Sequence, residues 1–257
     1  MLDVRWAADQ ATQPFALTAL EFSPSTGIPG IFRTVGTVSV DGVTGNAVLT
    51  EKNIALSNLV TASASGTFNV PAGYTQLRHS LVVRGRDGGT FSFTKQASST
   101  EFVVAVPVSA LLGDLEVVGE AAAPTGVTAF GSEVVRAGEK ANITYPAAPV
   151  LATPPDAAVG VTAATEFSWT GGASDCIYQV SLYSSDEGSV QHVIWTAANT
   201  VTLPDLGVAA LAPASTYRWS ATCHRQRAAA TIDEEVTAGG AKHTGSVATP
   251  EAQFSTQ

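Results

Sequence analysis

Short runs in which apolar and polar residues alternate cover most of this chain, and they predict β-strands. In one such run Tyr217, Trp219, Ala221 and Cys223 occupy every second position, so we expect these side chains to share the buried face of a strand. Patterns with the helical period are almost absent, while β-branched and small residues dominate. The sequence therefore predicts an all-β fold.

Turn residues divide the first part of the chain into many short predicted strands. Asp87-Gly88 lies between two alternating runs and predicts a tight hairpin that joins 81–83 to 90–93. Asp41-Gly42 and Pro71-Ala72-Gly73 are further turn signals. The strands expected here are 15–22, 32–40, 47–50, 59–64, 66–70, 79–84, 90–94, 102–107 and 115–118, followed by two more within 127–145 on either side of a turn at 136–139.

Two proline-rich segments, 146–149 and 153–156, predict a linker and the Pro-protected first strand of a second module. With 257 residues the chain is long enough for two cores, so we expect antiparallel β-sandwich domains in tandem, at 1–146 and 147–257. An insert rich in Ala, Gly and acidic residues, Ala228 to Ala248, precedes the last strand. The strands expected in the second domain are 150–151, 166–170, 176–183, 190–195, 200–203, one around Tyr217, and 252–255.

The composition limits the classes of partner. The net charge is -9, with only 13 Lys and Arg, and this argues against nucleic acid or an anionic membrane as the main partner. Apolar runs are too short for a transmembrane segment. The first residues lack the pattern of a signal peptide, so either the protein is cytoplasmic or Met1 stands where a leader was removed. We favour the second alternative, and hence an extracytoplasmic location: periplasm, outer surface or secreted.

The cysteines Cys176 and Cys223 are predicted to form a disulfide. In a sandwich their two strands would be antiparallel neighbours, and the parity of the residues places both side chains on one face at facing positions. A disulfide would indicate an oxidising compartment. Two buried free thiols remain the alternative.

The second part of the chain resembles a fibronectin type III module, which has an immunoglobulin-like sandwich fold. The residues that match are Trp169 on the second strand, Tyr178, Val180 and Leu182 on the third, and Leu211, Pro213 and Tyr217 at the sixth. The resemblance implies that the Tyr217 phenol bonds back to the main chain at a corner. It also implies spacer or protein–protein roles and no catalysis. The insert at 228–248 and the added 203–206 depart from the family.

Residues 66–85, a strand, a Pro-Gly turn and a second strand, resemble the carboxypeptidase-regulatory-like or transthyretin-like modules of exported bacterial proteins. This resemblance implies a β-sandwich in the first domain as well.

No motif for catalysis, metal binding or a cofactor occurs, and the histidines His79, His192, His224 and His243 are scattered. We therefore predict that the protein is not an enzyme and has no catalytic residue, metal or cofactor. An enzyme whose acidic or histidine-lined site assembles from distant residues is the alternative.

Two sets of residues are candidates for contacts with a ligand or partner. Trp195 and Tyr183 lie near a predicted edge strand, where an exposed aromatic ring stacks on a sugar or a protein; packing in the core or on the sheet face is the alternative. A charged group surrounds the insert, and we expect solvated ion pairs there rather than a calcium site, because the carboxylates lack calcium-loop spacing. Its members are Arg225, Arg227, Asp233, Glu234 and Glu235.

These observations predict a non-catalytic structural, adhesion or assembly component of the cell envelope or extracellular space, a lipoprotein among the forms considered. It would act through a protein partner or by self-association. The alternative is a carbohydrate-binding module that holds a polysaccharide with exposed aromatic side chains.

Overall fold

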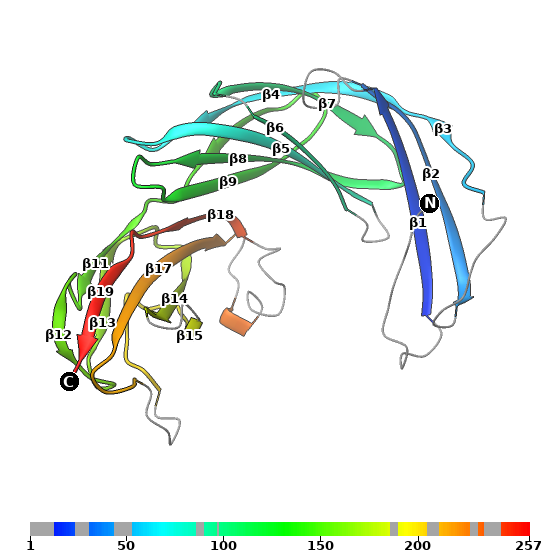
Figure 1. The fold of residues 1–257 in the computed structure, drawn as a ribbon. Coiled ribbons are helices and arrows are strands. Elements are labelled where there is room, and N and C mark those ends of the chain that lie inside the picture. The colour runs from blue at the N-terminus through cyan, green and yellow to red at the C-terminus, as the bar shows by residue number, and fades with distance from the viewer. Residues whose placement is uncertain are drawn as a thin grey trace. The chain divides into compact units, whose positions relative to one another are not determined.

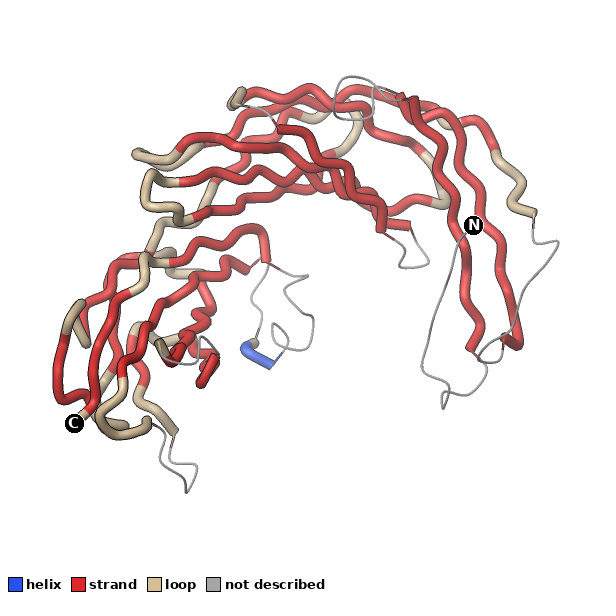
Figure 2. The backbone as a smooth tube through the Cα atoms, in the orientation of Figure 1, coloured by secondary structure: helices blue, strands red, loops and turns tan. Residues whose placement is uncertain are grey.

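A computed structural model describes residues 13–23, 31–43, 53–85, 90–96, 98–185, 190–204, 211–226, 231–233 and 243–257. Most of these residues lie in β-strands, which confirms the all-β prediction (Figures 1 and 2). The chain divides into two compact units. The first comprises Met1–Thr67, Arg78–Val118 and Glu133–Asn142, and the second comprises Phe68–Leu77, Gly119–Ser132 and Ile143–Gln257. The domain boundary at residue 146 stays a prediction.

The strands of the first part follow the alternating pattern of the sequence. β1, β2 and β3 form one antiparallel sheet in that order, and β4 lies between β10 and β7 in another. The strands β4, β5, β8, β9 and β10 contribute residues to both units. The bounds are β1 (Gln13–Ser23), β2 (Ile31–Val43), β3 (Ser57–Asn58), β4 (Val60–Asn69), β5 (Thr75–Gly85), β6 (Thr90–Gln96), β7 (Glu101–Val108), β8 (Leu112–Ala122), β9 (Thr128–Val135) and β10 (Lys140–Thr144).

The predicted hairpin between β5 and β6 is present in the first unit. Leu81 pairs with Phe93 across the two strands, and Leu81 is fully buried. The ring of Phe93 also packs edge to face against Phe22 and Phe32, with ring centroids 4.6 and 6.0 Å apart. These aromatic contacts tie the β1–β2 hairpin to β6.

The second unit contains two packed sheets. One has the order β11-β13-β16; in the other, β17 pairs with β14 on one side and with β18 and β19 on the other. All of these pairs are antiparallel except that of β12 with β19, which is parallel. The bounds are β11 (Pro149–Thr153), β12 (Ala158–Val161), β13 (Phe167–Gly171), β14 (Cys176–Ser184), β15 (Val190–Thr196), β16 (Thr200–Val201), β17 (Thr216–Gln226), β18 (His243–Ala248) and β19 (Ala252–Thr256).

Aromatic rings from both sheets fill the space between them. Phe167 on β13 meets Trp219 and Phe254 of the other sheet, at centroid distances of 5.2 and 5.7 Å. Trp169, two residues further along β13, contacts Tyr178 at 5.1 Å. All of these side chains are buried. The period-2 alternation of β13, β14 and β17 thus produces one continuous core.

The corner tyrosine is in place. The backbone N–H of Ala212 donates a 2.8 Å hydrogen bond to the Tyr217 hydroxyl, and the Tyr217 ring stacks on Phe254 at 5.5 Å. The Thr256 hydroxyl in turn donates to the carbonyl of Ala212 at 2.7 Å. The segment before β17 is therefore fastened to both β17 and β19.

Cys176 and Cys223 form a disulfide, with their Cα atoms 5.3 Å apart. The predicted facing positions are wrong by two residues, because Cys223 pairs with Tyr178 and Cys176 pairs with Arg225. The common face is right. Residues offset by two on neighbouring strands still share a face and lie within reach of each other, so the bridge forms diagonally.

The prediction that 228–248 is an insert between strands is wrong for its last residues, because 243–248 form strand β18. β18 pairs with β17, with His224 opposite Ser246. β18 and β19 lie one after the other along the same side of β17. Thr249 fills the break between β18 and β19. Its N–H donates to the carbonyl of Ala221 at 2.9 Å, and its hydroxyl accepts from the Ala221 N–H at 3.1 Å.

Other differences concern single strands. β12 was missed. β4 runs unbroken through Gly66, which pairs with Phe102 of β7, and glycine is needed there because a Cβ would collide with the carbonyl oxygen of Ala141 and the ring of Phe102. Asp41-Gly42, expected in a turn, lies within β2. The predicted strand 47–50 and the turn at Asp87-Gly88 lie outside the described residues.

Removing the disulfide is expected to destabilise the protein. A Cys176→Ala/Cys223→Ala variant frees the unfolded chain from a closed loop, which lowers the free energy of unfolding by roughly 2–4 kcal/mol. Urea denaturation with and without a reducing agent measures this. The wild type should approach the variant when reduced, and equal midpoints under both conditions would contradict the prediction.

Tyr217→Phe is expected to lower the free energy of unfolding by about 1 kcal/mol, because the Ala212 N–H loses its acceptor while the ring packing stays. The matched control is Tyr183→Phe on the half-buried Tyr183, for which we expect a change within about 0.5 kcal/mol. Thermal melting of the two variants side by side distinguishes them, and equal shifts would show that the corner bond contributes nothing.

Candidate functional site

The outer face of the sheet in the second unit carries the aromatic candidates. Since Tyr178, Val180 and Leu182 of β14 point into the core, the alternate residues point to the other side of the sheet, where Gln179 and Tyr183 are half-buried and Ile177 and Ser181 are buried. On that side Gln179 pairs with Trp195 of β15 and with Thr222 of β17. The next row brings Ser181 between Val193 and Ser220. We call this surface the Trp195 face; its members are Gln179, Ser181, Val193, Trp195, Ser220, Thr222 and His224.

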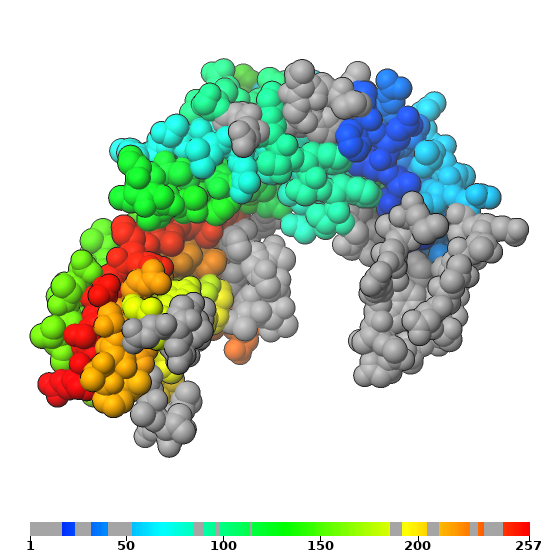
Figure 3. All heavy atoms as spheres, viewed as in Figure 1, coloured from blue at the N-terminus to red at the C-terminus, as the bar shows by residue number. Residues whose placement is uncertain are grey.

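Trp195 is half-buried, and it lies on the outer face rather than in the core. Its ring meets the imidazole of His224 at a centroid distance of 5.1 Å and a tilt of 38°. Beside it, the Gln179 amide donates a 3.3 Å hydrogen bond to the Ser181 hydroxyl. Atoms of the yellow part of the chain reach the surface of the second unit in Figure 3. The alternative expected for Trp195 was packing in the core or on the sheet face, and its ring packs on the sheet face.

Tyr183 lies on the same face without meeting Trp195. It follows Gln179 by four residues on β14, which corresponds to about 13 Å along the strand. Its neighbour across the pair is Arg218, whose guanidinium is bound to the Glu251 carboxylate at 3.1 Å. The two aromatic candidates thus share a surface but form no single cluster.

Of the charged candidates, Arg225 and Asp233 lie within the described residues. Arg225 lies 3.5 Å from the Asp175 carboxylate and donates a 2.8 Å hydrogen bond to the Thr144 hydroxyl. Asp233 is exposed. The remaining members of the group, Arg227, Glu234 and Glu235, lie outside the described residues. Across the described ranges, no three His, Cys, Asp or Glu side chains gather to hold a metal ion, and no helix there is long and apolar enough to cross a membrane.

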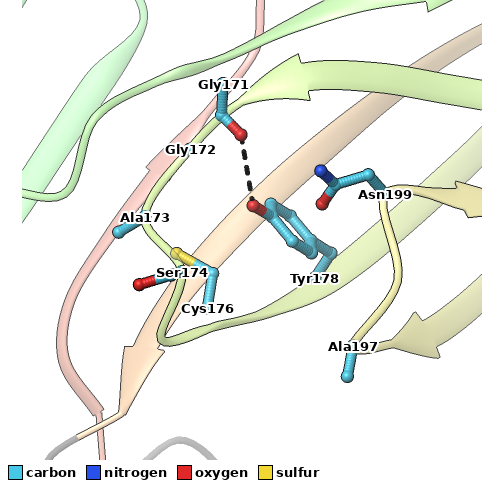
Figure 4. A pocket seen from close by; sticks show the side chains of 8 residues that line it. All are labelled: Gly171, Gly172, Ala173, Ser174, Cys176, Tyr178, Ala197 and Asn199. Atoms are coloured by element: carbon cyan, nitrogen blue, oxygen red, sulfur yellow. Dashed lines mark hydrogen bonds between the residues drawn. The ribbon is translucent and has the colours of Figure 1, made fainter.

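A small open pocket of about 260 Å³ lies beside the disulfide. The Tyr178 hydroxyl donates a 3.4 Å hydrogen bond to the Gly171 carbonyl, and the Asn199 side chain points toward the Tyr178 ring (Figure 4). Gly172 has a φ of +80°, and a Cβ there would collide with the Tyr178 hydroxyl. Glycine thus lets the turn approach the phenol. The lining residues are Gly171, Gly172, Ala173, Ser174, Cys176, Tyr178, Ala197 and Asn199.

The phenol of Tyr178 stays neutral at physiological pH. Burial raises its pKa, the Trp169 side chain acts in the opposite direction, and the charge of Asp175 adds to the rise. The pocket therefore offers a phenol, an amide and main-chain groups, which bind by hydrogen bonds. Sequence reasoning missed it, although the Gly171-Gly172 pair was the available signal.

The buried polar side chains Tyr145 and His79 serve packing. The Tyr145 hydroxyl donates a 2.7 Å hydrogen bond to the Gln76 side-chain carbonyl. Burial raises the pKa of Tyr145 to about 12, with a further rise from Glu120, while the bond to Gln76 acts against it. His79 lies 2.8 Å from the Ser99 carbonyl, and burial lowers its pKa.

The comparisons with known proteins identify no family. No family model matches the chain, and no curated protein matches it. A structure of a DUF3823 family protein from Parabacteroides merdae aligns over 76% of this chain and 98% of its own, at 10% identity and a TM-score of 0.23. One from Bacteroides ovatus aligns over 77% and 100%, at 10% identity and a TM-score of 0.22.

A tetra-tandem repeat from the extending region of a large adhesion protein aligns over 87% of this chain, at 15% identity and a TM-score of 0.25. The alignment covers 56% of that chain, so it spans about half its length. Similarities at these TM-scores carry no argument about this chain.

Alkaline titration is expected to reveal the buried Tyr145. Its folded pKa of about 12 exceeds the ordinary value of 10.0. The neutral form therefore stabilises the fold fully below pH 10, and this stabilisation is lost as the pH rises toward 12. Absorbance at phenolate wavelengths should show a late-ionising tyrosine that disappears in Tyr145→Phe. Retention of that late component in the variant would contradict the assignment.

Proposed function

We propose that this protein is a non-catalytic structural, adhesion or assembly component of the cell envelope or extracellular space that acts through protein–protein contacts. The observation that carries the proposal is a disulfide-linked sandwich in which one edge strand, β12, is apolar. The disulfide supports an oxidising compartment, because such bonds persist mainly in exported proteins.

The edge strand supports a contact with another protein. β12 pairs with β19 on one side, and no other described strand pairs with it. Its Val159 is 81% exposed. An open strand edge presents unpaired backbone groups, and an exposed valine adds apolar area, so a strand of a partner or of a second copy of this chain can add there.

The arrangement of the second unit supports a fibronectin type III-like module, the class that the sequence resembles. The supporting features are the Trp169–Tyr178 contact between the sheets and the corner bond of Tyr217. Such a module is a spacer or a contact domain. The likeness of 66–85 to carboxypeptidase-regulatory-like modules stays a prediction.

Site-specific cross-linking tests this proposal. A photoreactive amino acid at Val159 is expected to give a discrete cross-linked protein, or a dimer, in intact cells of the source organism. The matched control is the same residue at Thr202, which is exposed and lies outside β12. Both substitutions should leave the fold intact, since surface changes cost within about 0.5 kcal/mol. Equal labelling at both positions, or none at Val159, would contradict the proposed contact.

The location is tested on the thiols of the native protein. Trapping with an alkylating reagent in intact cells is expected to leave Cys176 and Cys223 unmodified, because both are in the disulfide. If both cysteines are fully alkylated when the protein is denatured in the presence of the alkylating reagent, the protein lies in a reducing compartment, and the extracytoplasmic assignment is overturned.

A further inference from the structure

The chemistry of the Trp195 face fits a sugar ring. A pyranose presents an apolar C–H surface and a rim of hydroxyl groups, and protein sites for such ligands combine an aromatic ring with a few polar side chains. Trp195 supplies the ring, and its contact with His224 holds it on the sheet at 5.1 Å. Gln179 and Thr222 follow it in one row across the strands.

The spacing of that row suits one sugar unit and its neighbour. Adjacent strands lie about 4.8 Å apart, so the row from Trp195 through Gln179 to Thr222 spans about 10 Å. An amide and a hydroxyl both donate and accept hydrogen bonds, which matches the dual character of sugar hydroxyls. The three side chains are half-buried, so each keeps surface for a ligand.

The charge of the face distinguishes between classes of ligand. Its seven members carry no formal charge when His224 is neutral, although the whole chain carries -9. Arg218 at the end of the face is paired with Glu251 at 3.1 Å. A neutral polar surface on an acidic protein disfavours polyanions such as nucleic acid or sulfated glycans, and it matches an uncharged glycan.

We propose that the Trp195 face binds a neutral glycan, with a sugar ring stacked on Trp195 and its hydroxyl groups bonded to Gln179 and Thr222. Tyr183, about 13 Å along β14 from Gln179, adds a contact for a longer chain. This site is separate from the β12 edge and does not depend on the protein contact proposed there.

Affinity electrophoresis tests the proposal on the full chain. Gels that contain xyloglucan, galactomannan or soluble starch are expected to retard the wild type in at least one case, and a gel with heparin is not. Trp195→Ala should weaken the interaction about tenfold or more, because central aromatic contacts dominate such sites. Gln179→Ala should weaken it as well, without removing the ring. Val150→Ala, at an exposed position of β11 in the opposing sheet, is the matched control and should bind as the wild type does.

Melting curves establish that the variants are folded. If Trp195→Ala does not fold, Gln179→Ala and the tryptophan fluorescence of a Trp6→Phe variant decide, since Trp169 and Trp219 are buried and Trp195 is half-buried. The proposal is overturned if none of these neutral polysaccharides retards the protein, or if the folded Trp195→Ala variant binds as the wild type does. It is also overturned if the protein partner identified by cross-linking binds the Trp195 face.

Discussion

The pairing of β14 with β17 is the interaction on which the second unit depends. The two strands stay in register from Cys176 opposite Arg225 to Ser184 opposite Tyr217. Every second residue of this pair enters the core, where Tyr178 and Trp219 meet Trp169 and Phe167 of the opposing sheet. The disulfide joins the same two strands on the same face. One ladder thus carries the core, the covalent link and, on its reverse side, the Trp195 face.

The reverse side follows from the period of a strand. Because alternate residues of β14 and β17 must fill the core, the remaining ones form a second surface whose composition is free to serve binding. Here that surface collects amide, hydroxyl and aromatic groups around Trp195. A rigid scaffold beneath such groups limits the entropy lost when a ligand binds.

Much of the fold could be predicted from the sequence, because alternation and turn residues are local signals. The β5–β6 hairpin, the strands β9 and β10 on either side of a turn, and the strands that carry Trp169, Tyr178 and Tyr217 are examples. β18 was missed because its Gly and Ser residues have weak strand preference, and pairing with β17 decides its conformation. The positions opposite the two cysteines could not be derived, since they depend on the register in which β14 and β17 pair.

The candidate site was predictable only in part. Trp195 and Tyr183 could be singled out as aromatic residues near an edge, but their separation along β14 and the contact with His224 depend on the pairing of three strands. The pocket at Tyr178 needed the positive φ of Gly171 and Gly172, which no pattern of hydrophobic residues shows.

Thr249 lets β17 remain hydrogen-bonded where its neighbouring strand is interrupted. Pro250, the next residue, has no N–H, yet the Thr249 hydroxyl accepts from Ala221 and its amide donates back to the same residue. With β14 on its other side, β17 therefore keeps partners along both flanks through the interruption. Amide hydrogens at the middle of β17 should thus exchange with deuterium only when the sandwich opens as a whole.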